Sequence, residues 1–382
     1  MKIPKFTSEA ETRQFLKENP YFCAKPFYSK EIDQTGQYIW CCHWEGKKLA
    51  RQEFADYDRS IFHDKKMIPQ CNFCYNVEKY SDYSERISDS VYALYHKRDL
   101  IEAGNQSMAI RFDNVCNVAC RMCNNGNSSL YSKVAGNGKI FEISEEDWQG
   151  IKNDLSTVKY MRLYGGETFL SKRLLELLNS DHSIENIQFQ TNCTVYKKEI
   201  MDKLADINQI DFGLSIDGIG PVNDYTRWPS KWSKVKENVE RFFEYKFTFI
   251  VNPVMNIYTV YYFDQLIDFF YPYMKDGVDI NINPIACFIP DWMSMKILPE
   301  AALDVIKQKF TSCLQHPIFT DFPLQTDNLT EGLNFIINAC DESEYTPEKW
   351  QQFKIQTYKW DLIQSMIFEE KLPELHKLIK AY

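Results

Sequence analysis

Residues 114–123 read Asn-Val-Cys-Asn-Val-Ala-Cys-Arg-Met-Cys and place three thiols, Cys116, Cys120 and Cys123, at the spacing C-x3-C-x2-C after a short apolar run. Three thiolates suit an iron–sulfur cube that keeps one iron open for a small molecule, because each of its irons needs a ligand. A closed structural zinc site takes all its ligands from the protein, and no further Cys or His follows nearby. The motif therefore indicates an open cluster site. The alternatives are buried structural thiols or a zinc site completed from a distant residue.

Length and composition indicate a soluble globular protein with room for a large domain and a smaller one. The chain has 382 residues, of which 44% are hydrophobic and 25% charged, and both fractions are ordinary for a globular fold. Its net charge of −9 provides no broad basic face, which argues against nucleic acid as the principal partner. No apolar run reaches the roughly 18 residues of a membrane span. We therefore expect a cytoplasmic protein with no membrane partner and with reduced cysteines.

Residues 1–90 hold a second set of thiols, Cys23, Cys41, Cys42, Cys71 and Cys74. The order strand, glycine turn, strand over residues 31–40 predicts a hairpin that brings Cys23 and Cys41 together. Cys71 and Cys74 then add a C-x2-C knuckle. Two pairs of thiols can close one metal site, and their spacing leaves zinc and an iron–sulfur cluster equally open.

Three neighbouring residues offer alternative ligands for this second site. Cys42 is either a ligand in place of Cys41 or a thiol that faces away, and the second interpretation is favoured because adjacent strand residues point to opposite faces. His43 and His63 could also bind metal, although a solvated or structural histidine is the commoner outcome.

From residue 105 onward, apolar β-branched runs alternate with helical stretches, which is typical of βα units around a parallel sheet. We expect strands at Met108–Phe112, Tyr160–Leu163, Ile187–Thr191, Ile210–Ile216, Thr248–Val251 and Val278–Pro284. Helices are expected between them near Glu145–Leu155, Lys172–Leu178, Lys198–Leu204, Lys231–Tyr245 and Val260–Met274. This α/β pattern predicts an open, partial (β/α)6 TIM-like barrel with its chemistry at the carboxyl ends of the strands.

Three domains follow from this pattern. Residues 1–104 form a small cysteine-rich module that ends in a linker helix at Tyr80–Glu102, before Gly104. Residues 105–299 form the barrel, and residues 300–382 form a C-terminal helical cover.

The loops at the predicted strand ends hold the residues Gly165, Gly166, Glu167, Asn192, Ser215 and Asp217. Paired glycines let the backbone approach a ligand closely, and Glu167 can accept hydrogen bonds from an ammonium group. Arg227 could hold a carboxylate in a bidentate pair. On residue type alone, a surface arginine at a helix entrance is the favoured interpretation of Arg227.

Together these residues resemble the radical S-adenosylmethionine (SAM) enzymes, in the SPASM/twitch branch. The triad fits the C-x3-C-x2-C signature, residues 165–167 fit the Gly-Gly-Glu motif, and residues 215–218 with Arg227 look like the S-x-D-G…R pattern. Cys23, Gly36 and Cys41 fit C-x12-G-x4-C, and a C-x2-C pair follows. This set is similar to a twitch module that binds one auxiliary [4Fe–4S] cluster. In most of the branch that module follows the barrel, whereas here it precedes it.

The resemblance extends to both sides of the barrel and has two departures. Glu78, Ser84 and Arg86 resemble the C-x2-C…E…S-x-R stretch of a twitch-containing subgroup, and Pro373–Leu375 resembles its Pro-Glu-Leu ending. Met122 replaces the usual aromatic residue before the last triad cysteine, and Thr168 replaces the proline that usually follows Gly-Gly-Glu. The contact before the last cysteine is largely made by backbone, so we expect Met122 to be tolerated.

The resemblance implies a [4Fe–4S] cluster on the triad with SAM bound at its open iron. Glu167 would hold the SAM ammonium and Arg227 its carboxylate. Backbone contacts would come from Met122 and the glycine turn Gly165–Gly166. Contacts to the ribose or methionine part would come from Asn192, Ser215 and Asp217.

The implied reaction is reductive cleavage of SAM to a 5′-deoxyadenosyl radical, which abstracts hydrogen from an unactivated C–H. An auxiliary [4Fe–4S] cluster on Cys23, Cys41, Cys71 and Cys74 would accept an electron, so that a peptide, a sugar or a related metabolite is oxidised or cross-linked. The implied partners are that substrate and an external electron donor of the flavodoxin or ferredoxin type. Two other interpretations are a non-catalytic metal-binding adaptor with a zinc knuckle and an RNA-modifying radical enzyme.

Overall fold

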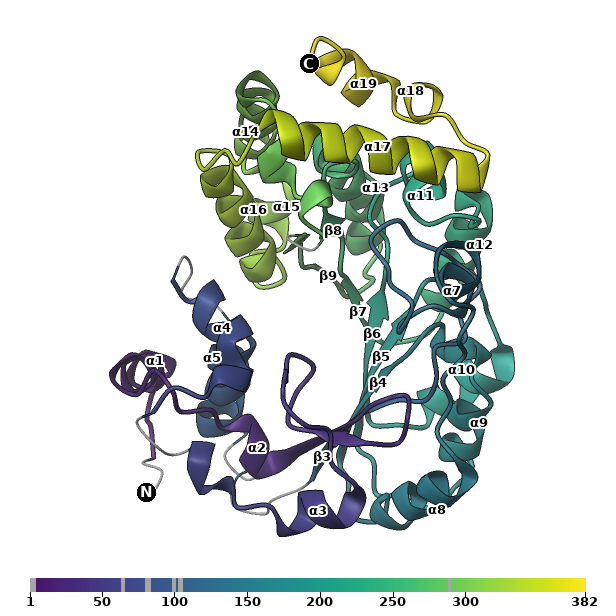
Figure 1. Ribbon diagram of the computed structural model, residues 1–382. Coiled ribbons are helices and arrows are strands. Elements are labelled where there is room, and N and C mark those ends of the chain that lie inside the picture. Colours follow the sequence, from purple (N-terminus) through teal and green to yellow (C-terminus); the bar gives the residue numbers. More distant parts are fainter. Residues whose placement is uncertain (1–4, 63–65, 80–83, 98–100, 102–105, 288–289) are drawn as a thin grey trace. The chain divides into compact units, whose positions relative to one another are not determined.

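The computed structural model describes residues 5–62, 66–79, 84–97, 101, 106–287 and 290–382 (Figure 1). His63 and Gly104 lie outside the described residues. The fold is α/β with a mostly parallel sheet, which is consistent with the predicted partial barrel. The chain forms two compact units: unit 1 is Met1–Asp113, Phe141–Gly165 and Arg173–Ile187, and unit 2 is Asn114–Ile140, Gly166–Lys172 and Gln188–Tyr382.

Unit 1 contains the sheet order β2-β1-β3-β4. Its strands are β1 (Ser29–Ile32), β2 (Tyr38–Ile39), β3 (Ser107–Arg111) and β4 (Tyr160–Tyr164). Its helices are α1 (Glu9–Glu18), α2 (Lys25–Tyr28), α3 (Arg51–Asp56), α4 (Asn72–Val77), α5 (Glu85–Val91) and α8 (Glu145–Asp154), and α9 (Lys172–Leu178) lies almost wholly in this unit. The predicted hairpin is present, with β1 antiparallel to β2. The sequence did not indicate that β1 also pairs in parallel with β3, so that the hairpin extends the sheet.

The core of unit 1 packs α1 and α5 together. Leu16 from α1 and Ile87 and Val91 from α5 lie in one buried apolar cluster with Phe22. Helix α5 and a π-helical turn at Tyr92–His96 lie within the predicted linker helix. Its residues 80–83, 98–100 and 102 lie outside the described residues. Residues 22–28 are therefore packed next to α5, which fixes the segment that carries Cys23.

Unit 2 contains the sheet order β5-β6-β7-β9 and a parallel β8–β10 pair. Its strands are β5 (Asn186–Thr191), β6 (Gln209–Leu214), β7 (Thr248–Val251), β8 (Val254–Met255), β9 (Ile280–Ile282) and β10 (Ile285–Ala286). Its helices are α7 (Ser129–Ala135), α10 (Lys198–Ala205), α11 (Pro221–Thr226), α12 (Trp232–Phe242), α13 (Phe263–Lys275), α14 (Glu300–Cys313), α15 (Ile318–Asp321), α16 (Asp327–Ala339), α17 (Pro347–Gln364), α18 (Phe368–Lys371) and α19 (Pro373–Ile379). Strands β3, β4, β5, β6, β7 and β9 match the six predicted strands.

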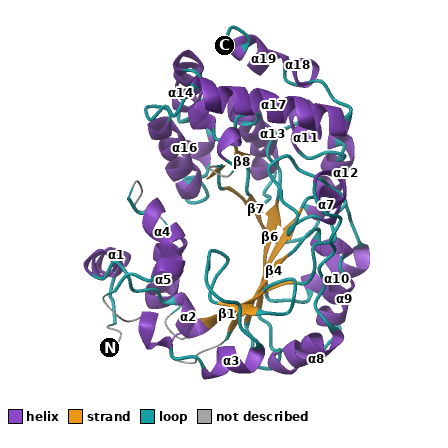
Figure 2. Cartoon of the chain, viewed as in Figure 1, coloured by secondary structure: helices purple, strands orange, loops and turns teal. Residues whose placement is uncertain are grey.

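Aromatic side chains fill the core of unit 2. Phe212 on β6 has its ring centroid 5.1 Å from that of Phe189 on β5 and 4.9 Å from that of Phe242 on α12. Helices α10 and α12 run along one side of β6 and β7 (Figure 2). The helices cover one face of these strands. In a barrel of this type the functional polar residues lie at the carboxyl ends of the strands and in the loops that follow.

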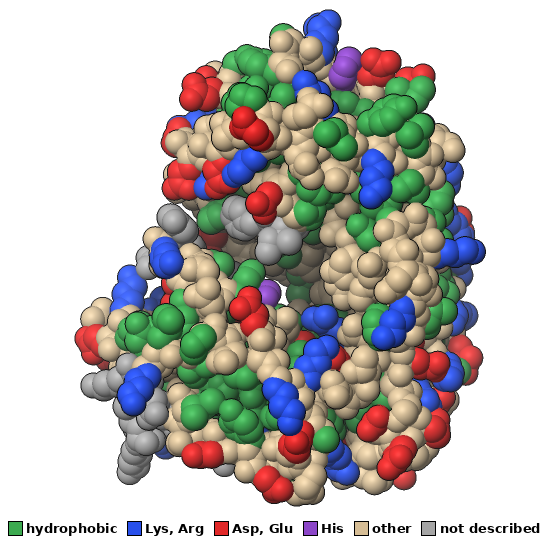
Figure 3. Space-filling view, viewed as in Figure 1, with side chains coloured by type: hydrophobic (Ala, Val, Ile, Leu, Met, Phe, Trp, Pro, Cys, Tyr) green, Lys and Arg blue, Asp and Glu red, His purple; other side chains and the backbone are tan. Residues whose placement is uncertain are grey.

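The C-terminal helices also belong to unit 2. Helix α14 packs against α16, and α17 packs against the short turn Asp291–Met293. Among the described residues, no helix is both long and apolar enough to cross a membrane. On the face seen in Figure 3, Lys and Arg side chains are interspersed with Asp and Glu.

Candidate cofactor site

Residues 114–123, here called the cluster loop, leave β3 and bring the three predicted thiols together. Cys116 and Cys120 lie in one small buried cluster with Val118, and Met122 and Cys123 pack against it. The amide of Cys116 donates to the hydroxyl of Ser129 at 3.1 Å. The loop therefore gathers sulfur atoms from residues 116, 120 and 123 in one place.

A second segment of unit 2 holds the cluster loop from the side of Arg227. The amide of Ala119 donates to the carbonyl of Trp228 at 2.6 Å, and the amide of Arg121 donates to the carbonyl of Thr226 at 2.9 Å. These two hydrogen bonds flank Arg227. Its Nη1 consequently lies 3.8 Å from Cys120 Sγ, within hydrogen-bonding reach of sulfur.

Burial shapes the chemistry of the three thiols. It raises the pKa of Cys116 to about 12 and raises the pKa of Cys120 and Cys123. Asn192 Nδ2 lies 3.8 Å from Cys116 Sγ and can donate to it. Without metal these thiols stay protonated, and a cationic iron centre would replace the protons while nearby N–H groups stabilise the bound sulfur. The donor set fits an iron–sulfur cluster.

The glycine turn after β4 docks onto the start of the cluster loop. Gly165 has φ +151°, a value that side chains with a Cβ rarely adopt. A Cβ on Gly166 would lie 2.2 Å from the carbonyl oxygen of Val115. The next amide, that of Glu167, donates to the same oxygen at 2.7 Å. Glycine is thus required at residue 166 because the turn touches the backbone of the cluster loop.

Glu167 is fully buried and oriented by three donors. Its Oε1 accepts from the Thr191 hydroxyl at 2.7 Å and from the Phe169 amide at 3.2 Å, and its Oε2 accepts from the Asn192 amide at 2.7 Å. Burial outweighs these hydrogen bonds and raises the pKa of Glu167 to about 7. A cation brought to this carboxylate would restore its ionised form.

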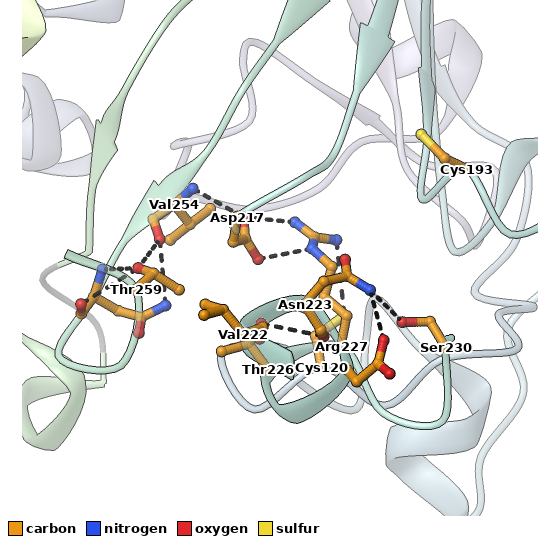
Figure 4. A network of polar contacts seen from close by, with 12 residues as sticks. Cys120, Cys193, Asp217, Val222, Asn223, Thr226, Arg227, Ser230, Val254 and Thr259 are labelled. Carbon is orange, nitrogen blue, oxygen red and sulfur yellow. Dashed lines mark hydrogen bonds and ion pairs between the residues drawn. The ribbon is translucent and has the colours of Figure 1, made fainter. Parts of the chain in front are cut away.

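Asp217 and Arg227 form a buried pair that the sequence did not indicate (Figure 4). Arg227 Nη2 donates to Asp217 Oδ1 at 2.8 Å, and Arg227 Nε lies 2.7 Å from Asp217 Oδ2. Asp217 also accepts from the amide of Val254 at 2.9 Å. The sequence predicted Asp217 and Arg227 as two separate contacts to the cofactor. In the structure the bidentate edge of Arg227 is taken by Asp217, and Nη1 is directed at Cys120.

Two further predicted positions lie beside these contacts. The amide of Ser215, just after β6, donates to the carbonyl of Thr191 at 2.9 Å, which places Ser215 next to the end of β5. The Thr168 hydroxyl donates to the carbonyl of Gln190 at 2.8 Å. Thr168, which replaces the proline of the Gly-Gly-Glu motif, therefore connects the glycine turn to β5. The sequence did not indicate this contact.

The second set of thiols gathers in unit 1. Cys23, Cys41, Cys71 and Cys74 line one cavity together with Lys25, His43, Tyr75, Glu85 and Arg86. Cys42 is exposed and is not among the lining residues. Burial raises the pKa of all four lining thiols, that of Cys71 to about 11. Among the described residues, no three Cys, His, Asp or Glu side chains are grouped as ligands of a single metal ion. An iron–sulfur cube does not require such a group, because each of its thiolates binds a different iron.

The Glu78, Ser84 and Arg86 motif connects the segments that carry these thiols. Arg86 Nη1 donates to the carbonyl of Phe22 at 2.8 Å, and its Nε donates to Glu78 Oε1 at 2.8 Å. The Ser84 hydroxyl also donates to Glu78. Phe22 precedes Cys23, and Glu78 follows α4, which carries Cys74. The buried guanidinium therefore fixes one thiol segment relative to the other.

Comparison with known proteins finds a similarity within the predicted barrel portion of the chain. Residues 110–270 match the family model described as the radical SAM superfamily. The solved structure "Native anSMEcpe with bound AdoMet" has 22% identity and a TM-score of 0.42, over 54% of this chain and 59% of that chain. Streptococcus suis SuiB bound to precursor peptide SuiA has 15% identity and a TM-score of 0.40, over 68% of this chain and 62% of that chain. No curated protein sequence matches.

The family match confirms part of the sequence prediction. The match covers residues 110–270, less than half of the chain, and supports the predicted enzyme class with its cofactors, SAM and a [4Fe–4S] cluster. The chain spans about three fifths of the anSMEcpe chain that it matches. The N-terminal twitch module and the roles of individual residues stay predictions.

Proposed function

We propose that this protein is a radical SAM enzyme whose cluster is held by Cys116, Cys120 and Cys123, and the match of residues 110–270 to the radical SAM superfamily model supports the proposal. The observation that carries this proposal is the convergence of the three thiols on one loop against which the Gly166–Glu167 turn is docked. When bound, the reduced cluster supplies the electron that cleaves SAM to methionine and a 5′-deoxyadenosyl radical, which removes a hydrogen atom from substrate. Difficult chemistry of this kind belongs to the cofactors, and the protein binds and orients them.

Glu167 is proposed to bind the SAM ammonium. It is a buried carboxylate whose orientation is set by Thr191, Phe169 and Asn192. A cationic ammonium compensates the burial that otherwise raises the pKa of Glu167. Glu167 follows the glycine turn that contacts the cluster loop, so an ammonium bound there would be close to the cluster.

Arg227 is proposed to contact the SAM carboxylate through Nη1 alone. Its other edge is paired with Asp217. Nη1 is directed at Cys120 Sγ, one of the three thiols that would hold the cluster. Asp217 thereby orients the guanidinium instead of touching SAM itself. Asn192 and Ser215 remain candidates for the ribose or methionine part, and Met122 for a backbone contact.

An auxiliary [4Fe–4S] cluster is proposed at Cys23, Cys41, Cys71 and Cys74. The four thiols line one cavity, and the Glu78–Arg86 pair fixes two of the segments that carry them. A cluster with four protein ligands would supply an acceptor for one electron. Loss of a hydrogen atom to the deoxyadenosyl radical, then of one electron and one proton, amounts to a two-electron oxidation of substrate. We therefore propose dehydrogenation or bond formation on a peptide, sugar or related metabolite, with a flavodoxin- or ferredoxin-type donor.

The test is anaerobic reconstitution followed by metal analysis and product assay. Two cubes correspond to about eight irons per chain, whereas about four irons with one zinc would remove the electron-transfer role of unit 1. With dithionite and SAM, the wild-type protein should form 5′-deoxyadenosine and Cys120→Ala should form none. Cys71→Ala should still cleave SAM but should not turn over substrate. Failure of the fully loaded wild-type protein to form 5′-deoxyadenosine, with candidate substrates present, would overturn the proposal.

A further inference from the structure

Arg121 lies inside the cluster loop, between Cys120 and Met122, and its side chain has no exposed surface. Its guanidinium carbon is 3.7 Å from the centroid of the Tyr225 ring and 5.5 Å from that of Tyr258. Its Nε donates to the carbonyl of Tyr225 at 3.1 Å. A buried guanidinium needs a compensating charge in addition to aromatic faces.

That charge comes from Asp361, on the last turns of α17 and far along the chain. Asp361 Oδ1 lies 2.6 Å from Arg121 Nη2 and accepts from the Tyr225 hydroxyl at 2.8 Å. Its Oδ2 accepts from the amide of Phe368 at 2.8 Å, so the carboxylate is itself held in place. The ion pair therefore has a fixed geometry on both sides.

Helix α17 contacts the cluster loop at a second point as well. Gln364, one turn after Asp361, donates from Nε2 to the carbonyl of Ala119 at 3.3 Å. The amides of Ala119 and Arg121 are meanwhile bonded to the carbonyls of Trp228 and Thr226. Cys120 thus lies between two residues whose amides bond to the Arg227 segment and which α17 contacts at the Ala119 carbonyl and the Arg121 guanidinium.

We propose that Arg121, Tyr225 and Asp361 form a positioning unit through which helix α17 fixes the cluster loop and the place of Cys120. The three residues act on Cys120 through the backbone of the loop, so they are positioning residues and not catalytic ones. By fixing the loop, they hold Cys120 Sγ at 3.8 Å from Arg227 Nη1. This inference deepens the proposed function, since it explains how a helix outside residues 110–270 contributes to the cofactor site.

A buried ion pair predicts that the effects of removing its two partners are not additive. Removal of one partner leaves the other charge buried and unpaired, whereas removal of both leaves no such charge. Arg121→Met and Asp361→Asn should therefore each loosen the loop, and the double variant should be less affected than the sum of the two. The two single variants should also shift the midpoint potential of a bound cluster in opposite directions. Loss of positive charge lowers the potential and loss of negative charge raises it.

The experiment measures amide hydrogen exchange of residues 116–123 and the midpoint potential in the full-length, reconstituted protein. Each single variant should speed exchange of this loop at least about tenfold, and the double variant should recover part of that change. Tyr358→Ala is the control, because Tyr358 is an exposed residue of the same helix, and it should change neither readout. Additive effects on exchange, or potentials that move in the same direction in both single variants, would overturn the proposal.

Exchange can also be followed in the cluster-free chain, which separates this inference from the proposed function. If the protein binds no iron but the loop still shows non-additive protection, the proposed function fails while the positioning unit stands. If 5′-deoxyadenosine forms normally and Asp361→Asn leaves exchange at wild-type rates, the positioning unit fails while the proposed function stands.

Discussion

Gly166→Ala should be among the most damaging one-carbon changes in the cofactor site. The added Cβ would lie 2.2 Å from the carbonyl oxygen of Val115 and 2.7 Å from the carbonyl carbon of Asn114. Non-bonded heavy atoms are most stable roughly 3.5–4.0 Å apart, so the overlap exceeds 1 Å and falls on backbone that cannot rotate away. Either the glycine turn or the start of the cluster loop must move.

The size of the effect follows from known costs of overpacking, about 1–3 kcal/mol or somewhat more. The amide of Glu167 bonds to the same Val115 oxygen, so the displacement would also move the carboxylate proposed to hold SAM. If this free energy is lost mainly from binding, SAM affinity should fall by about tenfold to a hundredfold, since about 1.4 kcal/mol corresponds to a factor of ten. If it is lost mainly from folding, the urea midpoint should fall instead.

Two measurements therefore test the prediction. Urea denaturation of the cofactor-free chain detects a loss of stability, and calorimetric titration of the reconstituted protein with SAM detects a loss of affinity. Gly150→Ala is a matched control. Gly150 lies within α8, and an added Cβ meets only the Arg51 side chain, at 3.6 Å. It should stabilise the protein by about 0.5–1 kcal/mol, the usual gain of alanine over glycine in a helix. Wild-type urea midpoint and wild-type SAM affinity in Gly166→Ala would refute the reasoning.

Three further changes test other contacts. Because burial raises the pKa of Glu167 to about 7, the SAM affinity should rise as the pH passes upward through that value and the carboxylate ionises; calorimetry at several pH values should find this dependence absent in Glu167→Gln. Thr168→Val removes the donor to the Gln190 carbonyl and should lower the free energy of unfolding by about 1–3 kcal/mol, and an unchanged urea midpoint would contradict that role. Cys41→Ser should halve the iron content from about eight to about four per chain, whereas Cys42→Ser should leave it unchanged; equal losses in both would argue against the assignment of Cys41.

Most of the fold could be predicted from local patterns in the sequence. The six strands and the helices between them follow from hydrophobic periodicity, which depends only on neighbouring residues. The pairing of β1 with β3 was missed because it joins Ser29–Ile32 to Ser107–Arg111, and no periodicity within either strand encodes its partner. For the same reason the thiol triad was predictable from spacing, since its members lie within a single loop.

The contacts that orient the thiols could not be read from spacing. The Asp217–Arg227 pair links residues that the sequence analysis assigned separately to the cofactor. Arg121 and Asp361 are further apart still, and arginine within a cysteine motif looks like an ordinary exposed residue. Its complete burial beside the rings of Tyr225 and Tyr258 distinguishes it. Partners of buried charges depend on tertiary packing, and for this reason the sequence did not indicate either ion pair.

The cluster loop is consequently held at three places before any metal binds. The glycine turn meets Val115, the Arg227 segment meets the amides of Ala119 and Arg121, and α17 meets the side chain of Arg121. Thiols fixed in this way stay close together although burial keeps them protonated, so the entropy of gathering them is lost on folding and not on cluster insertion. Ligands that are already in place would favour rapid and complete assembly of the proposed cluster. In the proposed function the two tasks are separate: backbone contacts hold the cluster loop, and the buried groups Glu167 and Arg227 would receive SAM.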